Sequence, residues 1–416
     1  MFRQIAALIF IFICTTVAWV ILGSTILYRT HDSDEQLKGR VGSTWGVPQE
    51  QAPPSATYTK TEIVPTTTIE NGKTIIHNNR EVRSYALPLE SSRVNANIHL
   101  DPRQKGLLWY STYQIDFTGD YKFQNDSGEK QDVSFRLLFP TERAMYDGVT
   151  LTINGAVVPL DADAQGRTGI ATLGPNETAL LHVGYRSQGM DSWRYKLADG
   201  VAQVKDFSLT MRTNFKNIDF ADDTLSPISK QLNSEGWELT WHYNDLVSGF
   251  PIGMTMPEKL QPGPLAGQIS YFAPVSLFFF FFLMFIITTV RNIDLHPMNY
   301  FFLATAFFAF HLLLAYLVDH ISIHAAMVIS SVVSVALVVS YLRLVVGIRF
   351  AALEAGTAQL IYLVLFSYAF FWKGFTGLAV TIISVITLFV VMQATGRIKW
   401  SEKFATRPGG ILPGSK

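Results

Sequence analysis

Apolar residues gather in six long runs, one near the start of the chain and five in its last third. The runs cover residues 5–27, 269–291, 298–318, 321–342, 355–371 and 375–392. An α-helix rises about 1.5 Å per residue, so runs of this length can cross the roughly 30 Å hydrocarbon core of a bilayer. We therefore predict an α-helical polytopic membrane bundle of six transmembrane helices. It has an N-terminal anchor at residues 1–27, five spans within residues 269–400 and a tail at residues 401–416.

The segment between the first two runs has the polarity of a water-soluble domain. Residues 28–80 are rich in Thr and Pro, which predicts a polar tether, and the Asn71-Gly72 pair can turn a hairpin inside it. In residues 81–268, short stretches alternate between apolar and polar positions, with turn signals about every ten residues. This pattern predicts a large β-sandwich-like domain, antiparallel and in one or two lobes. Its clearest strands are residues 110–117, 133–139, 149–153, 179–185, 207–213 and 237–243.

The positive charges predict how the helices are oriented. If the β domain lies outside the cytoplasm, nine Lys and Arg side chains of the ends and breaks fall inside, and only Lys373 of the bundle falls outside. Cytoplasmic loops carry the excess of Lys and Arg, so we expect both chain ends in the cytoplasm and the β domain on the opposite side of the membrane. The first run is long and no clear Ala-x-Ala site follows it, so we expect a retained anchor rather than a cleaved signal peptide.

Charge is divided unevenly, although the whole chain is neutral. Residues 28–268 carry 23 basic and 29 acidic side chains, a net charge of −6, and the remaining residues carry a net charge of +6. Neither part has the clustered basic and aromatic side chains of a nucleic-acid-binding surface. The only cysteine is Cys14, which excludes an intrachain disulfide and a thiolate zinc site. We expect no cofactor, and the bilayer as one partner.

Three ionisable residues of the third apolar run are the candidate functional residues in the membrane. His311 lies past the middle of the run, and Asp319 and His320 follow at its outer end. A polar side chain at membrane depth costs free energy unless it faces other helices or water, so it is a functional candidate by default. Two interpretations stay open: a proton or cation relay in a proton-coupled or lipid-handling transporter, or a neutral His311 that hydrogen-bonds a neighbouring helix.

Three tryptophans are candidates for a partner surface: Trp45, Trp237 and Trp241. Trp237 and Trp241 are four residues apart in a predicted strand, so both rings lie on the same face. They either fill the domain core or lie at the membrane interface. The β domain shows no metal-binding or nucleophile motif, so we expect a binding function rather than catalysis.

Several motifs resemble the CreD family of bacterial inner-membrane proteins. The most specific is His296-Pro297-Met298-Asn299-Tyr300-Phe301-Phe302-Leu303 with Asp319-His320-Ile321, and Phe272-Ala273-Pro274-Val275-Ser276 and Trp45-Gly46-Val47-Pro48-Gln49 also resemble the family pattern. The chain departs from that pattern at residues 371–374, where an acidic pair usually precedes the last helix. The resemblance therefore indicates a divergent branch.

The resemblance implies a role in cell-envelope integrity and in the response to envelope stress, and it implies no catalytic residues. We expect a non-enzymatic protein that presents its periplasmic domain to an unknown protein, cell-wall or lipid partner. The alternatives are the transporter that uses His311 and, third, a membrane-embedded hydrolase, which the missing intramembrane His-Glu and Asp-pair motifs disfavour.

Overall fold

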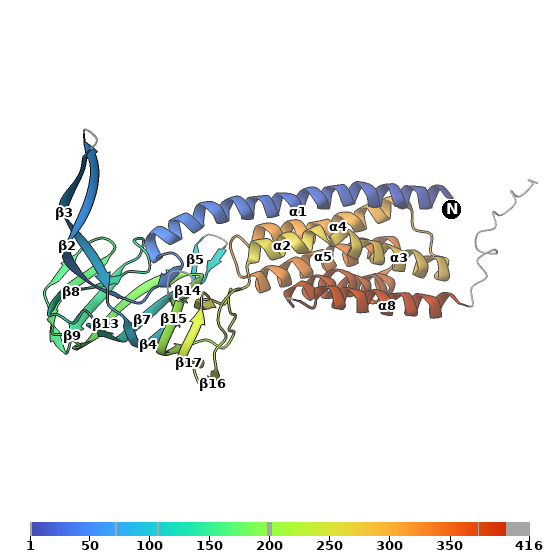
Figure 1. Ribbon diagram of the computed structural model, residues 1–416. Helices are drawn as coiled ribbons and strands as arrows, with labels where there is room; N and C mark the ends of the chain where they lie inside the picture. The colour runs from blue at the N-terminus through green and yellow to red at the C-terminus, as the bar shows by residue number, and fades with distance from the viewer. Residues whose placement is uncertain (1, 71–72, 106–107, 198–201, 373, 397–416) are drawn as a thin grey trace, which may run out of the picture. The chain divides into compact units, whose positions relative to one another are not determined.

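A computed structural model describes residues 2–70, 73–105, 108–197, 202–372 and 374–396 (Figure 1). The chain divides into two compact units. One is helical and contains Met1–Glu35, Gly106–Leu108 and Leu260–Lys416, and the other is β-rich and contains Gln36–Lys105 and Trp109–Lys259. The tail at residues 401–416 and the turn residues 71 and 72 lie outside the described residues.

The helical unit contains the predicted apolar helices. Six helices of the described residues are long and apolar enough to cross a membrane, which confirms the six apolar runs. The helices are α1 (Phe2–Trp45), α2 (Pro262–Tyr271), α3 (Ala273–Arg291), α4 (Pro297–Leu317), α5 (Ile323–Val345), η1 (Phe350–Ala355), α6 (Gly356–Gln359), η2 (Leu360–Leu365), α7 (Phe366–Tyr368), η3 (Ala369–Phe371) and α8 (Thr376–Thr395).

Local sequence signals explain where these helices begin and end. Pro297 occupies the first turn of α4, where its missing N–H costs nothing, and the His296 ring accepts a hydrogen bond from the Met298 amide. The Ser322 hydroxyl accepts from the Ala325 amide at the start of α5. Asn292 ends α3 in the left-handed conformation that Asn tolerates better than most residues.

The fifth span is irregular. It runs from Phe350 to Phe371, so it starts five residues before the predicted residue 355. Its segments η1 and η2 are π-helical and η3 is a 3₁₀ turn. Wide π turns change which side chains face the neighbouring helices and recur at functional sites.

The described residues of the β-rich unit form four sheets. Their strand orders are β10-β9-β13-β7-β4-β15-β17-β16, β11-β12-β8-β2-β3, β1-β14-β18 and β5-β6. The strands are β1 (Gln49–Gln51), β2 (Ser55–Glu70), β3 (Lys73–Ala86), β4 (Leu89–Leu100), β5 (Arg103–Lys105), β6 (Leu108–Tyr110), β7 (Thr112–Gln124), β8 (Gln131–Leu138), β9 (Tyr146–Ile153), β10 (Ala156–Val157), β11 (Leu160–Ala162), β12 (Gly166–Leu173), β13 (Thr178–Met190), β14 (Ser192–Tyr195), β15 (Ala202–Thr213), β16 (Ser229–Leu232), β17 (Trp237–Ser248) and β18 (Ile252–Thr255).

Alternating apolar residues make the core of this unit. In β7 the side chains of Tyr113, Ile115 and Phe117 are buried, whereas those between them are exposed. One hydrophobic cluster joins residues of the eight-, five- and three-stranded sheets, which confirms a large β-rich domain. Most pairs are antiparallel as expected, but β4 pairs with β15 and β1 with β14 in parallel.

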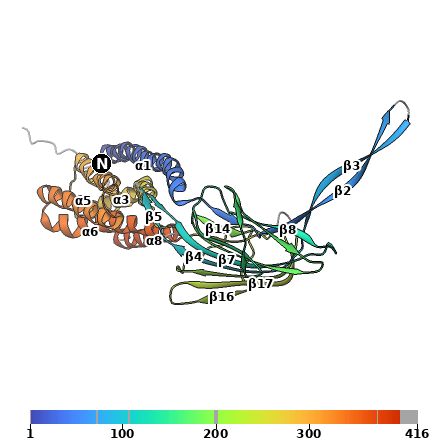
Figure 2. The same ribbon diagram turned by 90° about the vertical axis from the view of Figure 1, so that its left-hand side faces the viewer.

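Residues 28–80 differ from the predicted tether. Helix α1 continues to Trp45, and the turn that ends it is at Gly46. The φ angle of Gly46 is +95°, and a Cβ atom there would lie 2.3 Å from the Gln188 carbonyl oxygen. Only glycine fits there. The possible hairpin is instead the longest β pairing of the unit, β2 with β3, and it extends past the rest of its sheet (Figure 2).

Candidate functional site

His311 is held inside the helical unit by aromatic rings. It is 1% exposed, and the rings of Trp19, Phe307 and Phe310 pack around it at centroid distances of 5.6, 6.4 and 4.9 Å. Its Nδ1 lies 3.1 Å from the Phe307 carbonyl oxygen. A carbonyl can only accept, so Nδ1 carries the proton in this contact. These contacts favour packing over a relay, but the hydrogen-bond partner differs from the expected one: it is a backbone carbonyl of the same helix and not of a neighbouring helix.

Trp19 completes this cluster from the N-terminal helix. Its side chain is fully buried, and its Nε1 has no hydrogen-bond partner among the described residues. Its ring also packs edge-on against Phe307 and Phe308. Through these contacts the Trp19 ring packs α1 against α4, which is a structural role.

Asp319 and His320 lie apart from His311. Asp319 forms an ion pair with Arg29 of α1 at 3.3 Å, and His320 is exposed in the turn after α4. Eight residues of helix separate His311 from Asp319, about 12 Å of rise. Among the described residues no hydrogen bond or ion pair links His311 to Asp319, and no group of three or more His, Cys, Asp or Glu there could hold a metal ion.

A separate set of buried polar side chains connects three helices. Ser334 Oγ of α5 donates to the Ala306 carbonyl oxygen of α4 at 2.6 Å and accepts from Gln359 Nε2 of α6 at 2.7 Å. Ser334 and Gln359 are fully buried. Hydrogen bonds of this kind hold transmembrane helices together. Gln359 lies between the π-helical segments η1 and η2.

The three tryptophans take different positions. Trp241 is fully buried and its Nε1 donates to the Leu225 carbonyl oxygen at 2.8 Å, so its side chain is part of the core. Trp237 is partly buried against the same core, and its Nε1 donates to the Lys216 carbonyl oxygen. Trp45 is partly buried, with the Arg103 guanidinium 4.1 Å above its ring. Trp45 also borders a cavity.

That cavity has a volume of about 730 Å³ and lies in the β-rich unit. The C-terminal end of α1 forms one wall with Lys38, Gly42 and Trp45, and the loop between β8 and β9 forms the other with Arg143 and Met145. Lys38 also pairs with Asp191 at 2.9 Å, which holds the helix end against the strands. The walls offer both charged and apolar contacts, as a protein-binding or ligand-binding cleft does.

The Tyr146 side chain fixes the loop between β8 and β9, which forms one wall of the cavity. Its hydroxyl donates to the Thr141 carbonyl oxygen at 2.7 Å and accepts from the Thr141 amide at 3.0 Å, and its ring stacks on Phe139 at 4.1 Å. Burial raises the pKa of Tyr146 to about 12, so the hydroxyl stays protonated and keeps both bonds near neutral pH. The loop therefore presents Met145 in a defined position.

A second, more polar cavity of about 480 Å³ adjoins the first and shares Met145 and Gln188 with it. Its walls include Asp116 of β7 and the ion pair of Arg186 with Asp147 at 2.5 Å. Met145 lines both cavities, and we call the two together the Met145 cleft.

Sequence reasoning missed both the Met145 cleft and the Arg29–Asp319 ion pair. The ion pair joins residues 290 positions apart, and no local pattern reports such a contact. One sequence feature does point to the cleft. The aromatic residues Phe139 and Tyr146 flank a short turn, a pattern that indicates a loop held in one conformation.

Comparisons with known proteins bear on the bundle. The family described as inner membrane protein CreD matches residues 268–401. Among solved structures, a putative nutrient binding protein from Legionella pneumophila aligns at 12% identity over 56% of this chain and 76% of its own, with a TM-score of 0.36. An M1 zinc metallopeptidase mutant from Deinococcus radiodurans aligns at 12% identity over 41% of this chain and 42% of its own, with a TM-score of 0.25.

These two structural likenesses are too weak to support an inference, and the chain spans less than half the length of the metallopeptidase. No match was found among curated proteins. The family match, in contrast, coincides with the helices and includes the motifs at Pro297 and Asp319. The chain is a multi-pass membrane protein, and its residues 268–401 match the CreD family of inner membrane proteins.

Proposed function

We propose that this protein contributes to cell-envelope integrity without catalysis, by presenting its β-rich unit to an envelope partner in the periplasm. The observation that carries the proposal is the Met145 cleft, which lies in a large polar unit whose chain continues into a CreD-type bundle. The charge distribution supports a periplasmic position, since the excess of Lys and Arg then lies in the cytoplasm. We further propose that the two large sheets pack as a sandwich over their shared core.

The cleft suits a protein or cell-wall partner better than a small substrate. Both cavities open to the surface, and their walls combine the charged residues Lys38, Arg143 and Asp116 with the apolar side chain of Met145, which is 64% exposed. Flexible Met side chains adapt to a partner surface. A partner that fills the cleft would bury Met145 and reach the Trp45–Arg103 pair.

In-cell photocrosslinking tests this proposal. A photoreactive amino acid at Met145 should capture a defined envelope component, whereas the same residue at Val157, which is 83% exposed in β10, should not. Cells that lack the protein should also lose resistance to detergent or to agents that act on the envelope. Equal capture at both positions, together with normal resistance of the deletion strain, would contradict the proposal.

The transporter alternative is tested separately. If His311 relays protons, replacement by Leu should abolish a transport-linked phenotype, and Asn, which keeps a hydrogen-bond donor, should not restore it. If His311 only packs, the Asn variant should behave like the native protein in the envelope assay. The aromatic enclosure of His311 favours the second outcome.

A further inference from the structure

The β2–β3 hairpin extends far beyond the part of β2 that pairs with the next strand of the sheet, β8. β2 pairs with β8 only over Ser55–Tyr58, whereas it pairs with β3 from Thr57 to Glu70. Residues 59–70 and 73–84 therefore form a two-stranded ribbon, about 40 Å long at roughly 3.3 Å per residue. An isolated two-stranded ribbon is marginally stable in water. In the sheet order, β3 is the edge strand.

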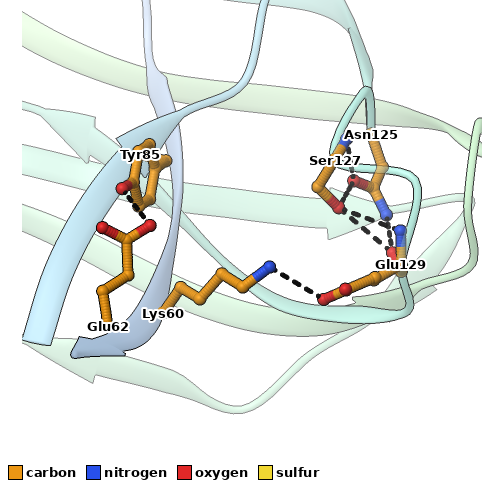
Figure 3. A network of polar contacts seen from close by, with 6 residues as sticks. All are labelled: Lys60, Glu62, Tyr85, Asn125, Ser127 and Glu129. Atoms are coloured by element: carbon orange, nitrogen blue, oxygen red, sulfur yellow. Dashed lines mark hydrogen bonds and ion pairs between the residues drawn. The ribbon is translucent and has the colours of Figure 1, made fainter.

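The base of the ribbon is firmly held. The rings of Tyr58 and Tyr85 stack at 5.5 Å. The Tyr85 hydroxyl donates to Glu62 at 2.7 Å, and Lys60 pairs with Glu129 at 3.2 Å (Figure 3). Asn125 fixes the turn that carries Glu129 by donating to its carbonyl oxygen at 2.8 Å. The base therefore sets the direction in which the ribbon leaves the sheet.

Charges above the base are arranged unfavourably within one chain. Glu62 lies directly opposite Glu81, and Lys60 directly opposite Arg83. Like charges in directly opposite positions destabilise a pair of strands. Arg83 compensates in part through ion pairs with Glu81 of its own strand at 3.3 Å and, diagonally across the ribbon, with Glu62 at 3.7 Å. Next to these charges, Val82 is 71% exposed.

The edge of β3 is complementary to itself. If a second β3 lies antiparallel to the first with Val82 opposite Val82, each Glu81 comes to lie opposite an Arg83 of the other copy. The same register brings the two exposed valines together. We propose that β3 is a dimerisation edge that pairs with β3 of a second copy of this chain about a two-fold axis at Val82. This surface is distinct from the Met145 cleft and does not depend on the envelope role.

The proposed pairing would stabilise the two-stranded ribbon and would place opposite charges across from each other. It gives each ribbon the strands of the other copy and so forms a four-stranded sheet, which is stable where a two-stranded one is not. It also gives Glu81 and Arg83 directly opposite partners of opposite charge. A two-fold interface of this kind uses the same patch on both subunits and closes, so it forms dimers rather than open fibres.

Disulfide trapping in native membranes tests the register. In a Cys14→Ser background, Val82→Cys should form a dimer with itself upon mild oxidation, because opposite Cα atoms of antiparallel strands lie about 4.5 or 5.5 Å apart, within disulfide reach. Ile63→Cys is the matched control. Ile63 is 64% exposed on the same ribbon, but two β2 strands would lie at least three strand spacings, about 14 Å, apart. Equal or absent crosslinking at the two positions would overturn the proposal.

A charge exchange separates pairing between copies from effects within one chain. Glu81→Arg and Arg83→Glu should each weaken the self-association of their own chain, since like charges then face each other across the axis. When two differently tagged chains carry one change each, every opposite pair is again of opposite sign. Heterodimers should then exceed either homodimer by about tenfold in Val82→Cys trapping. Random mixing of the two chains would contradict a β3–β3 interface.

Discussion

At the scale of single residues, buried tyrosine hydroxyls connect the strands of the β-rich unit. The Tyr121 and Tyr195 hydroxyls lie 3.0 Å apart, Tyr113 donates to the Ser192 carbonyl oxygen at 2.8 Å, and Tyr185 donates to Gln51 Oε1 at 2.6 Å. Each ring is almost fully buried. A buried hydroxyl costs free energy unless it is paired, so these bonds specify which strands meet.

The Tyr185–Gln51 contact can be tested alone. Replacing Tyr185 by Phe leaves the buried Gln51 oxygen without its donor, which should lower the free energy of unfolding by about 1–3 kcal/mol. Chemical denaturation of the detergent-solubilised protein, followed by tryptophan fluorescence, measures the change. Tyr243→Phe is a suitable control, because its ring is only partly buried and no partner for its hydroxyl is found in the described chain. Equal effects of both changes would argue against the bond.

The same tyrosines predict alkaline sensitivity. Burial raises the pKa of Tyr121, Tyr185 and Tyr195 above the ordinary value of 10.0 and raises that of Tyr146 to about 12. A folded-state pKa that is raised means that the stability is fully present below the unfolded pKa and is lost as the pH rises towards the folded one. The β-rich unit should therefore keep its stability up to about pH 10 and lose it progressively between about pH 10 and 12.

Tyrosinate absorbance and circular dichroism across this range check the prediction. The buried tyrosines should ionise late and together with unfolding. Gradual ionisation of all tyrosines near pH 10 without loss of structure would contradict it.

At the scale of elements, glycines let α1 approach α2 closely. A Cβ atom at Gly23 would lie 3.0 Å from the backbone nitrogen of Tyr271, one at Gly263 would lie 2.7 Å from the Thr30 hydroxyl, and one at Gly267 would meet Leu27. Small residues permit such contacts between membrane helices, where dispersion contacts provide much of the attraction. The close approach thus depends on residues that hydropathy does not distinguish.

Two alanine substitutions on α1 should therefore have different effects on stability. Gly23→Ala meets backbone that cannot move away, so it should destabilise the helix packing by about 1–3 kcal/mol. Gly39→Ala meets nothing within 4 Å and should be neutral or stabilising by up to about 1 kcal/mol, because Ala favours the helix. Thermal unfolding in detergent measures both. A decrease of similar size in the two variants would contradict close packing at Gly23.

At the scale of the whole molecule, the orientation of the spans is the main expectation still to be measured. In a Cys14→Ser background, Ile321→Cys lies in the turn between α4 and α5, and Ile348→Cys lies between α5 and η1. A membrane-impermeant thiol reagent applied to cells with an opened outer membrane should label the first and should label the second only after the inner membrane is disrupted. The reverse pattern would invert the topology and place the β-rich unit in the cytoplasm.

Some features of the fold followed from the sequence because they are local. The six apolar runs needed only length and composition, and strands such as β7, β8 and β13 needed only alternation over a few residues. The CreD-type motif around Pro297 is also a short, contiguous pattern. The extent of α1 was missed for a different reason: its polar second half has no long apolar run, and only the turn at Gly46 shows where the helix ends.

The sequence by itself thus determined a membrane bundle of six apolar helices and a separate β-rich unit, since burial of apolar side chains depends on composition and spacing that can be counted along the chain. Only the tertiary structure decided which distant residues meet. It placed His311 among aromatic rings with Trp19, paired Arg29 with Asp319 and put Trp241 in the core. It also made the Met145 cleft from segments that are far apart in the sequence, and the self-complementary edge of β3 from a strand register. Such contacts depend on long-range packing and pairing, which no local pattern encodes.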